Sequence, residues 1–324
     1  MRTRPIHHRA GLLVLTLSLV LAACAADPED VDLGDADAPV AGESVSLVAN
    51  PWPGSYANAN VAAIILESEL GVDVDIVEID ENAQWAGLDD GTLDAVLEIW
   101  PSGHLDNFAT YVDELGTVEL IGELGAVGQI GWFMPSYVLD DHPEATSWEG
   151  LAGIESEFAT AETGDSGQFL AADPSFVQFD EHIIDNLGLD FEVIQSGSEA
   201  AQLTAVEAAI ERGEPALFYF YTPHWLHAQY DLTMVELPEW TEECEERPVE
   251  ERDCGYPEDV LVKAAHAGLA ERLPAVYTFL ANFQLQNEDQ DEITFAMDVE
   301  GLDARDAAQA WVDANEDVWR AWLP

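Results

Sequence analysis

Basic side chains are scarce in this sequence. Its 324 residues include 10 Lys and Arg against 65 Asp and Glu, which gives a formal net charge of −55. Three of the ten, Arg2, Arg4 and Arg9, lie close to the N-terminus. A chain so poor in cations cannot neutralise a phosphate backbone, so the composition excludes nucleic-acid binding. It also argues against docking to anionic lipid through a basic patch.

The acidity does not indicate disorder. Hydrophobic residues make up 48% of the chain and ten residues are Trp, far more than in chains that cannot bury a core. The length suits one large domain or two lobes. We interpret the surplus charge chiefly as a solvated surface adapted to high salt. Attraction of a cationic ligand is the alternative.

Long apolar runs are also scarce, and the run near the N-terminus is short. Residues 11–20 (GLLVLTLSLV) follow the basic start, which is typical of an export signal and too short to span a bilayer. They lead into Leu21-Ala22-Ala23-Cys24, which resembles a bacterial lipobox. The resemblance implies removal of residues 1–23 and lipidation of Cys24 at the outer face of the cell membrane. A signal cut elsewhere, with an incidental Cys24, is the alternative. The acidic residues 24–43 predict a flexible tether.

The sequence has three cysteines. Cys244 and Cys254 lie close together in one acidic segment of an exported chain, so we expect them to form a disulfide. A zinc site is disfavoured because no His lies near them, and the C-x-x-C spacing of redox sites is absent. The sequence predicts no metal site and no cofactor.

Predicted strands and helices alternate along the chain after residue 43. This succession predicts an α/β fold with a largely parallel sheet, and two such sets predict two lobes with a ligand cleft between them. The predicted strands are 45–49, 72–79, 95–100, 131–138, 191–195 and 215–221. The predicted helices are 60–69, 83–90, 176–187, 199–212, 260–280 and 304–323.

Several short motifs resemble those of glycine betaine-binding proteins of ABC importers. The first lobe has Trp52, the Asn58-Ala59-Asn60-Val61 helix start, Gln84-Trp85 and Trp100-Pro101-Ser102-Gly103-His104; the second has Tyr221-Thr222-Pro223-His224-Trp225 followed by Tyr230-Asp231-Leu232. The resemblance implies a type II periplasmic-binding-protein fold without catalysis, and permease and ATPase subunits as partners. It places lobe 1 at 44–134 plus 258–324 and lobe 2 at 135–257.

The resemblance also implies a quaternary ammonium ligand held in an aromatic box. Such a cation has no hydrogen-bond donor and is best held by aromatic faces. The box aromatics are Trp52, Trp100, Tyr221 and Trp225. Trp100 stands one place later than the Trp of the family pattern, and a one-residue slip in a strand turns a side chain to the other face. Only a local bulge or bend returns Trp100 to the cleft.

The family's carboxylate-binding positions match His104 and the loop residues Gly167 and Gln168. A ligand carboxylate needs donors, either from a His or from backbone N–H groups. Choline, proline betaine and carnitine are alternative ligands to glycine betaine. Choline lacks a carboxylate and does not need His104. A surface sensor or interaction lipoprotein on the same fold is the second class of function.

Two further patterns receive structural interpretations. Trp311, Trp319 and Trp322 fall on one helical stripe and are expected in the core. Gly164-Asp165-Ser166-Gly167 matches the nucleophile motif of chymotrypsin-like proteases. Those enzymes are all-β and need His and Asp in their own contexts, so we expect no enzyme here.

Overall fold

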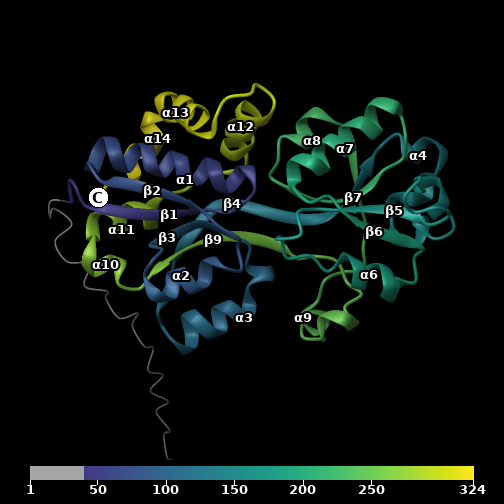
Figure 1. Ribbon diagram of the computed structural model, residues 1–324, viewed down its shortest axis with the longest axis horizontal. Coiled ribbons are helices and arrows are strands. Elements are labelled where there is room, and N and C mark those ends of the chain that lie inside the picture. The colour runs from purple at the N-terminus through teal and green to yellow at the C-terminus, as the bar shows by residue number, and fades with distance from the viewer. Residues whose placement is uncertain (1–39) are drawn as a thin grey trace, which may run out of the picture. The chain divides into compact units, whose positions relative to one another are not determined.

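A computed structural model describes residues 40–324 of the protein (Figure 1). The predicted export signal at 1–23, the lipidation site Cys24 and the tether as far as residue 39 lie outside the described residues. We call residues 40–324 the described body.

A nine-stranded mixed sheet forms the centre of this body, in the order β2-β1-β3-β9-β4-β7-β5-β6, with β8 paired to β4. β1 pairs in parallel with β2 and β3, and β5 pairs in parallel with β6 and β7. The pairings that involve β4 and β9 are antiparallel, so the prediction of a largely parallel sheet is wrong at the centre. The strands are β1 (Ser44–Ala49), β2 (Asp73–Glu78), β3 (Ala95–Ile99), β4 (Val118–Pro135), β5 (Gly167–Ala171), β6 (Phe191–Gln195), β7 (Leu217–Thr222), β8 (Leu232–Val235) and β9 (Glu258–His266).

The long strand β4 connects the two parts of the sheet. Over residues 118–129 it pairs with β9, and over residues 129–135 it pairs with β7 and β8. We call β1, β2 and β3 with their helices the first half, and β5, β6, β7 and β8 with theirs the second half. Figure 1 shows the two halves side by side with β4 and β9 running between them.

The helix predicted over 260–280 is wrong in its first part. Residues 258–266 form β9, and helices follow only after it. Asp259, Leu261 and Lys263 are buried on one face of this strand. Two of these three side chains are charged, so the sequence does not show the alternation of apolar and polar residues that is typical of a strand. The Lys263 Nζ donates to the carbonyl oxygens of Leu280, Ala281 and Phe283, at the end of the helix over Pro274–Asn282.

Helices cover both faces of the sheet (Figure 1). The first half carries α1 (Pro53–Ile65), α2 (Gln84–Asp90), α3 (Leu105–Asn107), α10 (Leu269–Arg272), α11 (Pro274–Asn282), α12 (Asn287–Asp298), α13 (Ala304–Ala314) and α14 (Glu316–Trp319). The second half carries α4 (Val138–Asp141), α5 (Trp148–Leu151), α6 (Asp180–Leu187), α7 (Glu199–Arg212), α8 (Leu226–Gln229) and α9 (Glu242–Glu245).

Local signals account for the ends of two helices near the site. α1 begins at Pro53, whose fixed φ suits the first helical position, directly after the extended residue Trp52. α7 begins where the Ser198 side chain accepts from the Ala201 N–H, and it ends at Gly213, which has φ 66°. α7 follows the predicted bounds, whereas α12 was not predicted.

Large side chains and one disulfide consolidate the body. Trp311, Trp319 and Trp322 are buried, as predicted, and Trp311 stacks on Trp322 with ring centroids 6.1 Å apart. Cys244 and Cys254 form a disulfide, which is the pairing predicted from the sequence. It closes the loop that contains α9, immediately before Tyr256 and β9.

Candidate ligand-binding site

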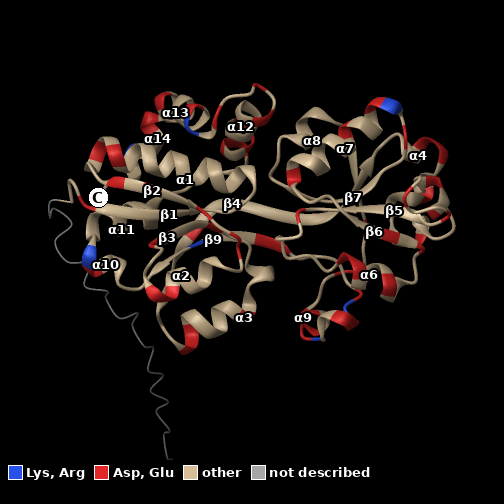
Figure 2. Ribbon diagram, in the orientation of Figure 1, with Lys and Arg blue, Asp and Glu red and all other residues tan. Residues whose placement is uncertain are grey.

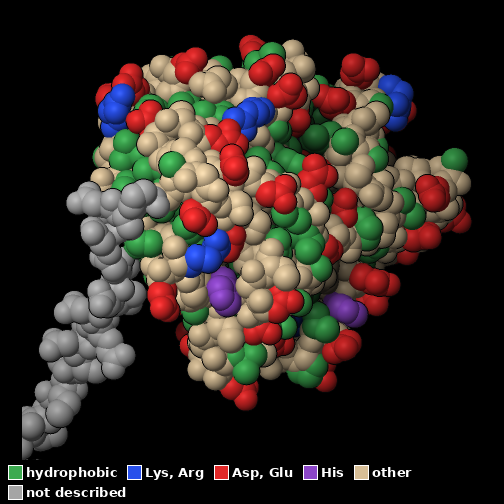
Figure 3. All heavy atoms as spheres, turned by 60° about the vertical axis from the view of Figure 1, so that its left-hand side comes forward, with side chains coloured by type: hydrophobic (Ala, Val, Ile, Leu, Met, Phe, Trp, Pro, Cys, Tyr) green, Lys and Arg blue, Asp and Glu red, His purple; other side chains and the backbone are tan. Residues whose placement is uncertain are grey.

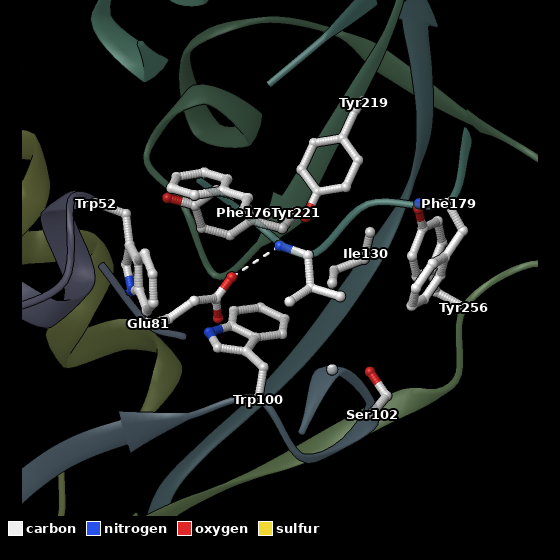
Figure 4. A pocket seen from close by; sticks show the side chains of 12 residues that line it. Trp52, Glu81, Trp100, Ser102, Ile130, Phe176, Phe179, Tyr219, Tyr221 and Tyr256 are labelled. Atoms are coloured by element: carbon white, nitrogen blue, oxygen red, sulfur yellow. Dashed lines mark hydrogen bonds between the residues drawn. The ribbon is translucent and has the colours of Figure 1, made fainter. Parts of the chain in front are cut away.

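A cavity lined by aromatic side chains lies between the two halves (Figure 4). Trp52 and Trp100 come from the first half, and Tyr219 and Tyr221 come from β7 of the second half. Trp52 meets Phe176 edge to face with ring centroids 5.4 Å apart, and Trp100 meets Tyr221 in the same way at 5.6 Å. Trp52, Trp100 and Tyr221 are 5%, 8% and 6% exposed. The described body is therefore closed around this cavity. Its lining also includes Glu81, Ser102, Gly103, Ile130, Val177, Phe179 and Tyr256.

A bulge brings Trp100 to the cavity. In the pairing of β3 with β9, Val96 stands opposite Ala264 and Ile99 opposite Val262, so β3 has one extra residue between these pairs. Such an insertion re-aims the side chains that follow it. The chain then turns at Pro101. This bulge is the kind of local irregularity that Trp100 needs in order to face the cleft.

One buried carboxylate holds both indoles of the cavity. Glu98 Oε1 accepts from Trp52 Nε1 at 2.7 Å and from Trp100 Nε1 at 3.0 Å. Glu98 Oε2 accepts from Asn58 Nδ2 at 2.6 Å and from Gln290 Nε2 at 3.0 Å. Burial raises the pKa of Glu98, and the four donated hydrogen bonds oppose that rise. Sequence reasoning missed Glu98, although a single acid inside the apolar strand AVLEI is a visible signal.

The phenol rings come from alternate positions of β7. Tyr219 and Tyr221 share one face of the strand, since the side-chain period is two. The Tyr221 hydroxyl donates to Glu199 Oε2 at 2.8 Å. Burial raises the pKa of Tyr219 and of Tyr221 well above the ordinary value, so both phenols stay neutral. Tyr219 and Tyr256, both cavity residues, were not predicted; the alternation in LFYFYT gives the signal for Tyr219.

A second carboxylate, Glu81, enters the cavity itself. Its Oε1 accepts from the backbone N–H of Val177 at 2.7 Å, which joins a loop of the first half to a loop of the second (Figure 4). Its Oε2 lies 3.0 Å from His104 Nε2. Trp85 Nε1 donates to His104 Nδ1 at 3.3 Å, so the His104 proton is on Nε2 and is donated to Glu81.

The predicted carboxylate-binding residues are not in the cavity lining. His104 is buried, and its two ring nitrogens are engaged by Glu81 and by Trp85 and Asn107. The Gly167 N–H donates to the Asp190 carbonyl at 2.9 Å. The Gln168 Oε1 accepts from Thr160 Oγ1 at 2.9 Å. Gly167 and Gln168 are the first two residues of β5 and pair there with β6, so they belong to the sheet and not to a loop beside the cavity.

Trp225 is also placed outside this cavity. Its Nε1 donates to Asp298 Oδ2 at 2.7 Å, which joins the start of α8 to the end of α12. Trp225 and Glu199 line a separate outer groove, which Trp52 also borders. The structure therefore brings Trp52, Trp100 and Tyr221 together and leaves Trp225 apart from them.

The described residues contain no group of three or more His, Cys, Asp and Glu side chains that is placed to hold a metal ion. In residues 40–324 no helix is both long and apolar enough to span a bilayer. The chemistry of the cavity is thus that of buried aromatic faces with two carboxylates, one behind the indoles and one in the lining.

A family model described as the substrate-binding domain of an ABC-type glycine betaine transport system matches residues 43–314. The chain belongs to this family. Members of the glycine betaine-binding family are extracytoplasmic solute-binding components that act with permease and ATPase subunits and are not enzymes. The two-lobed fold implied by the sequence resemblance is confirmed.

Three relatives bear on the ligand class. The trimethylamine N-oxide-binding protein of Pelagibacter ubique is 24% identical over 275 residues, covering 83% of this chain and 87% of the relative. Lactococcal OpuAC complexed with glycine betaine is 21% identical with a TM-score of 0.69, covering 87% of this chain and all of the relative. A choline-binding protein in complex with choline is 21% identical with a TM-score of 0.69, covering 86% of this chain and 91% of the relative.

Proposed function

We propose that this protein captures a choline-type quaternary ammonium solute and delivers it to the permease of an ABC importer. The observation that carries the proposal is the set of buried aromatic faces that both halves contribute to one cavity. Trp52, Trp100 and Tyr221 surround the trimethylammonium group. Each face contributes roughly 0.5–2 kcal/mol of cation–π attraction, more where the site is dry.

Glu81 supports choline over glycine betaine. The protein's own carboxylate occupies the His104 Nε2–H and the Val177 N–H, which are donors of the kind that a ligand carboxylate needs. A second carboxylate placed beside Glu81 is repelled at short range in a poorly solvated site. A choline hydroxyl instead donates to Glu81.

Calorimetry with choline and glycine betaine tests this choice of ligand. We expect the wild-type protein to bind choline at least about tenfold more tightly. Glu81→Gln should narrow that gap, because it removes the charge that repels the betaine carboxylate. Tighter binding of glycine betaine by the wild type would contradict the role given to Glu81.

The box itself is tested by Trp52→Ala. Loss of one aromatic face and of its buried area should raise the Kd for choline by roughly 10- to 100-fold. Trp148→Ala on α5, outside the cavity lining, is the matched control. Unchanged affinity in Trp52→Ala removes Trp52 from the site.

We propose that residues 44–134 with 258–324, and residues 135–257, are lobes that hinge at β4 and β9. Support comes from the cavity, whose lining both halves supply, and from the Glu81–Val177 hydrogen bond that joins them. Domain closure about such strands is a common response to ligand. Solution scattering should show a smaller radius of gyration with choline than without it. An identical radius in both samples would remove the hinge.

We further propose that Cys24 is lipidated and anchors the protein outside the cell membrane. The support is the sequence alone, namely the lipobox-like Leu21-Ala22-Ala23-Cys24 after a short apolar run. Cys24→Ser should move the protein from the membrane fraction to the medium or periplasm. Continued membrane association would contradict the anchor.

The acidic surface supports adaptation to high salt. Figure 2 shows Asp and Glu on helices of both halves, and Figure 3 shows them spread over one face with few cations between them. The seven Lys and Arg of the described residues make internal contacts: Arg212, Arg247, Arg272, Arg305 and Arg320 pair with carboxylates, Arg252 lies over Phe179, and Lys263 binds carbonyls. Thermal stability should therefore rise with KCl, and a fall would contradict the proposal.

A further inference from the structure

Glu98 is a buried acidic side chain without a cationic partner among the described residues. The side chain is 2% exposed. Its four donors are two indoles and two amides, all neutral. Within residues 40–324, no ion pair involves Glu98. A buried and uncompensated charge is costly to a fold, so its presence directly behind the two indoles needs a reason.

The neighbours of Glu98 favour its ionised form. A protonated carboxyl needs an acceptor for its proton, whereas all four groups in contact with it donate. The Gln290 amide also donates to Asn58 Oδ1 at 3.1 Å, which fixes how the Asn58 amide is turned. The network is therefore arranged to hold a carboxylate.

We propose that Glu98 is the counter-charge of the aromatic box. Its carboxylate polarises Trp52 and Trp100 through their N–H groups, so that both indole faces bind a cation more strongly than unpolarised rings would. Hydrogen bonds to an ionised acceptor are strong and polarise the donor group, and the attraction of a cation to a ring grows with the electron density of its face. The inference rests on the proposed function, since it concerns the same cavity.

This role predicts selectivity for charge over shape. The neutral alcohol 3,3-dimethylbutan-1-ol has the shape of choline with carbon in place of nitrogen. A box that only packs around methyl groups binds choline and the neutral alcohol with similar affinity, apart from the ordinary cation–π attraction that choline gains. A box with Glu98 behind its indoles favours the cation further. Glu98 is thus a positioning and selectivity residue that acts through Trp52 and Trp100.

Calorimetry of both ligands on Glu98→Gln is the test. Gln keeps an oxygen that accepts from both indoles, and its amide nitrogen can face the Asn58 and Gln290 amides after these turn over. We expect the Kd of the neutral alcohol divided by the Kd of choline to fall at least about tenfold. The Kd of the neutral alcohol itself should change less than about threefold. Glu149→Gln, which removes one charge at an exposed position of α5, should leave the ratio unchanged.

An unchanged ratio in a folded Glu98→Gln protein overturns the inference. If that variant does not fold, Trp52→Phe supplies the second test, because Phe keeps an aromatic face and has no N–H to offer Glu98. A smaller fall in that ratio is expected there, because Trp100 keeps its hydrogen bond to Glu98, and an unchanged ratio again overturns the inference. A wild-type protein that binds neither ligand refutes the proposed function instead, so the two failures are distinguishable.

Discussion

Asp180 makes the stability of the protein depend on pH in a defined direction. This carboxylate at the start of α6 accepts from Trp132 Nε1 at 2.7 Å and from the hydroxyl of the cavity residue Tyr256 at 3.2 Å, both at Oδ1. Its Oδ2 is buried and has no partner among the described residues. Burial raises the pKa of Asp180 to about 6 from its ordinary 3.8, against the hydrogen bonds that lower it.

The sign and size of the effect follow from these values. Because the pKa is higher in the folded than in the unfolded protein, the stability that Asp180 contributes is fully present below pH 3.8 and is lost as pH rises through about 6. The shift corresponds to roughly 3 kcal/mol. Asp180→Asn keeps an oxygen for both donors and removes the charge.

Thermal unfolding of the wild-type and Asp180→Asn proteins between pH 4 and pH 7.5 measures this contribution. The difference in free energy of unfolding, variant minus wild type, should rise by roughly 2.4 kcal/mol over this range, or about 4–5 °C in Tm, because part of the shift is already expressed at pH 4. Asp185→Asn, at an exposed position of the same helix, controls for the loss of one negative charge. A difference that is flat across this range would refute the reasoning.

Two other substitutions test contacts around the cavity. Gly128 of β4 lies against the Trp100 ring, where an added Cβ would overlap ring atoms. Gly128→Ala should therefore displace the indole and weaken choline binding at least about tenfold in calorimetry. An unchanged Kd would show that Trp100 does not touch the ligand. Replacing Cys244 and Cys254 together by Ser should lower the free energy of unfolding by roughly 2–3 kcal/mol in urea titration, and an unchanged midpoint would mean that the loop around α9 does not contribute to global stability.

The sequence predicts the place of a site residue best where the local pattern alone decides which way the side chain points. Trp52 stands between a strand end and a proline turn, so its place at the cavity follows from the local pattern. Trp100 depends on an extra residue in β3, which only strand pairing reveals. His104 keeps its expected spacing, yet it lies behind Glu81, because a buried His pairs with the nearest available carboxylate.

Long-range pairing explains what the sequence does not reveal. β4 carries Gly and Glu residues that are unfavourable in strands, and it is held by β9, which follows it by more than a hundred residues. Glu98 is visible as a lone acid in an apolar strand. Its four donors lie as far away in the chain as Gln290, so its role becomes apparent only in the folded body.

A crystal structure of the choline complex tests the central claim most directly. We predict the ligand nitrogen within about 6 Å of the ring centroids of Trp52, Trp100 and Tyr221, with the choline hydroxyl at hydrogen-bonding distance from Glu81. A choline molecule found instead in the outer groove beside Trp225, or a cavity without ligand at saturating choline, would contradict it.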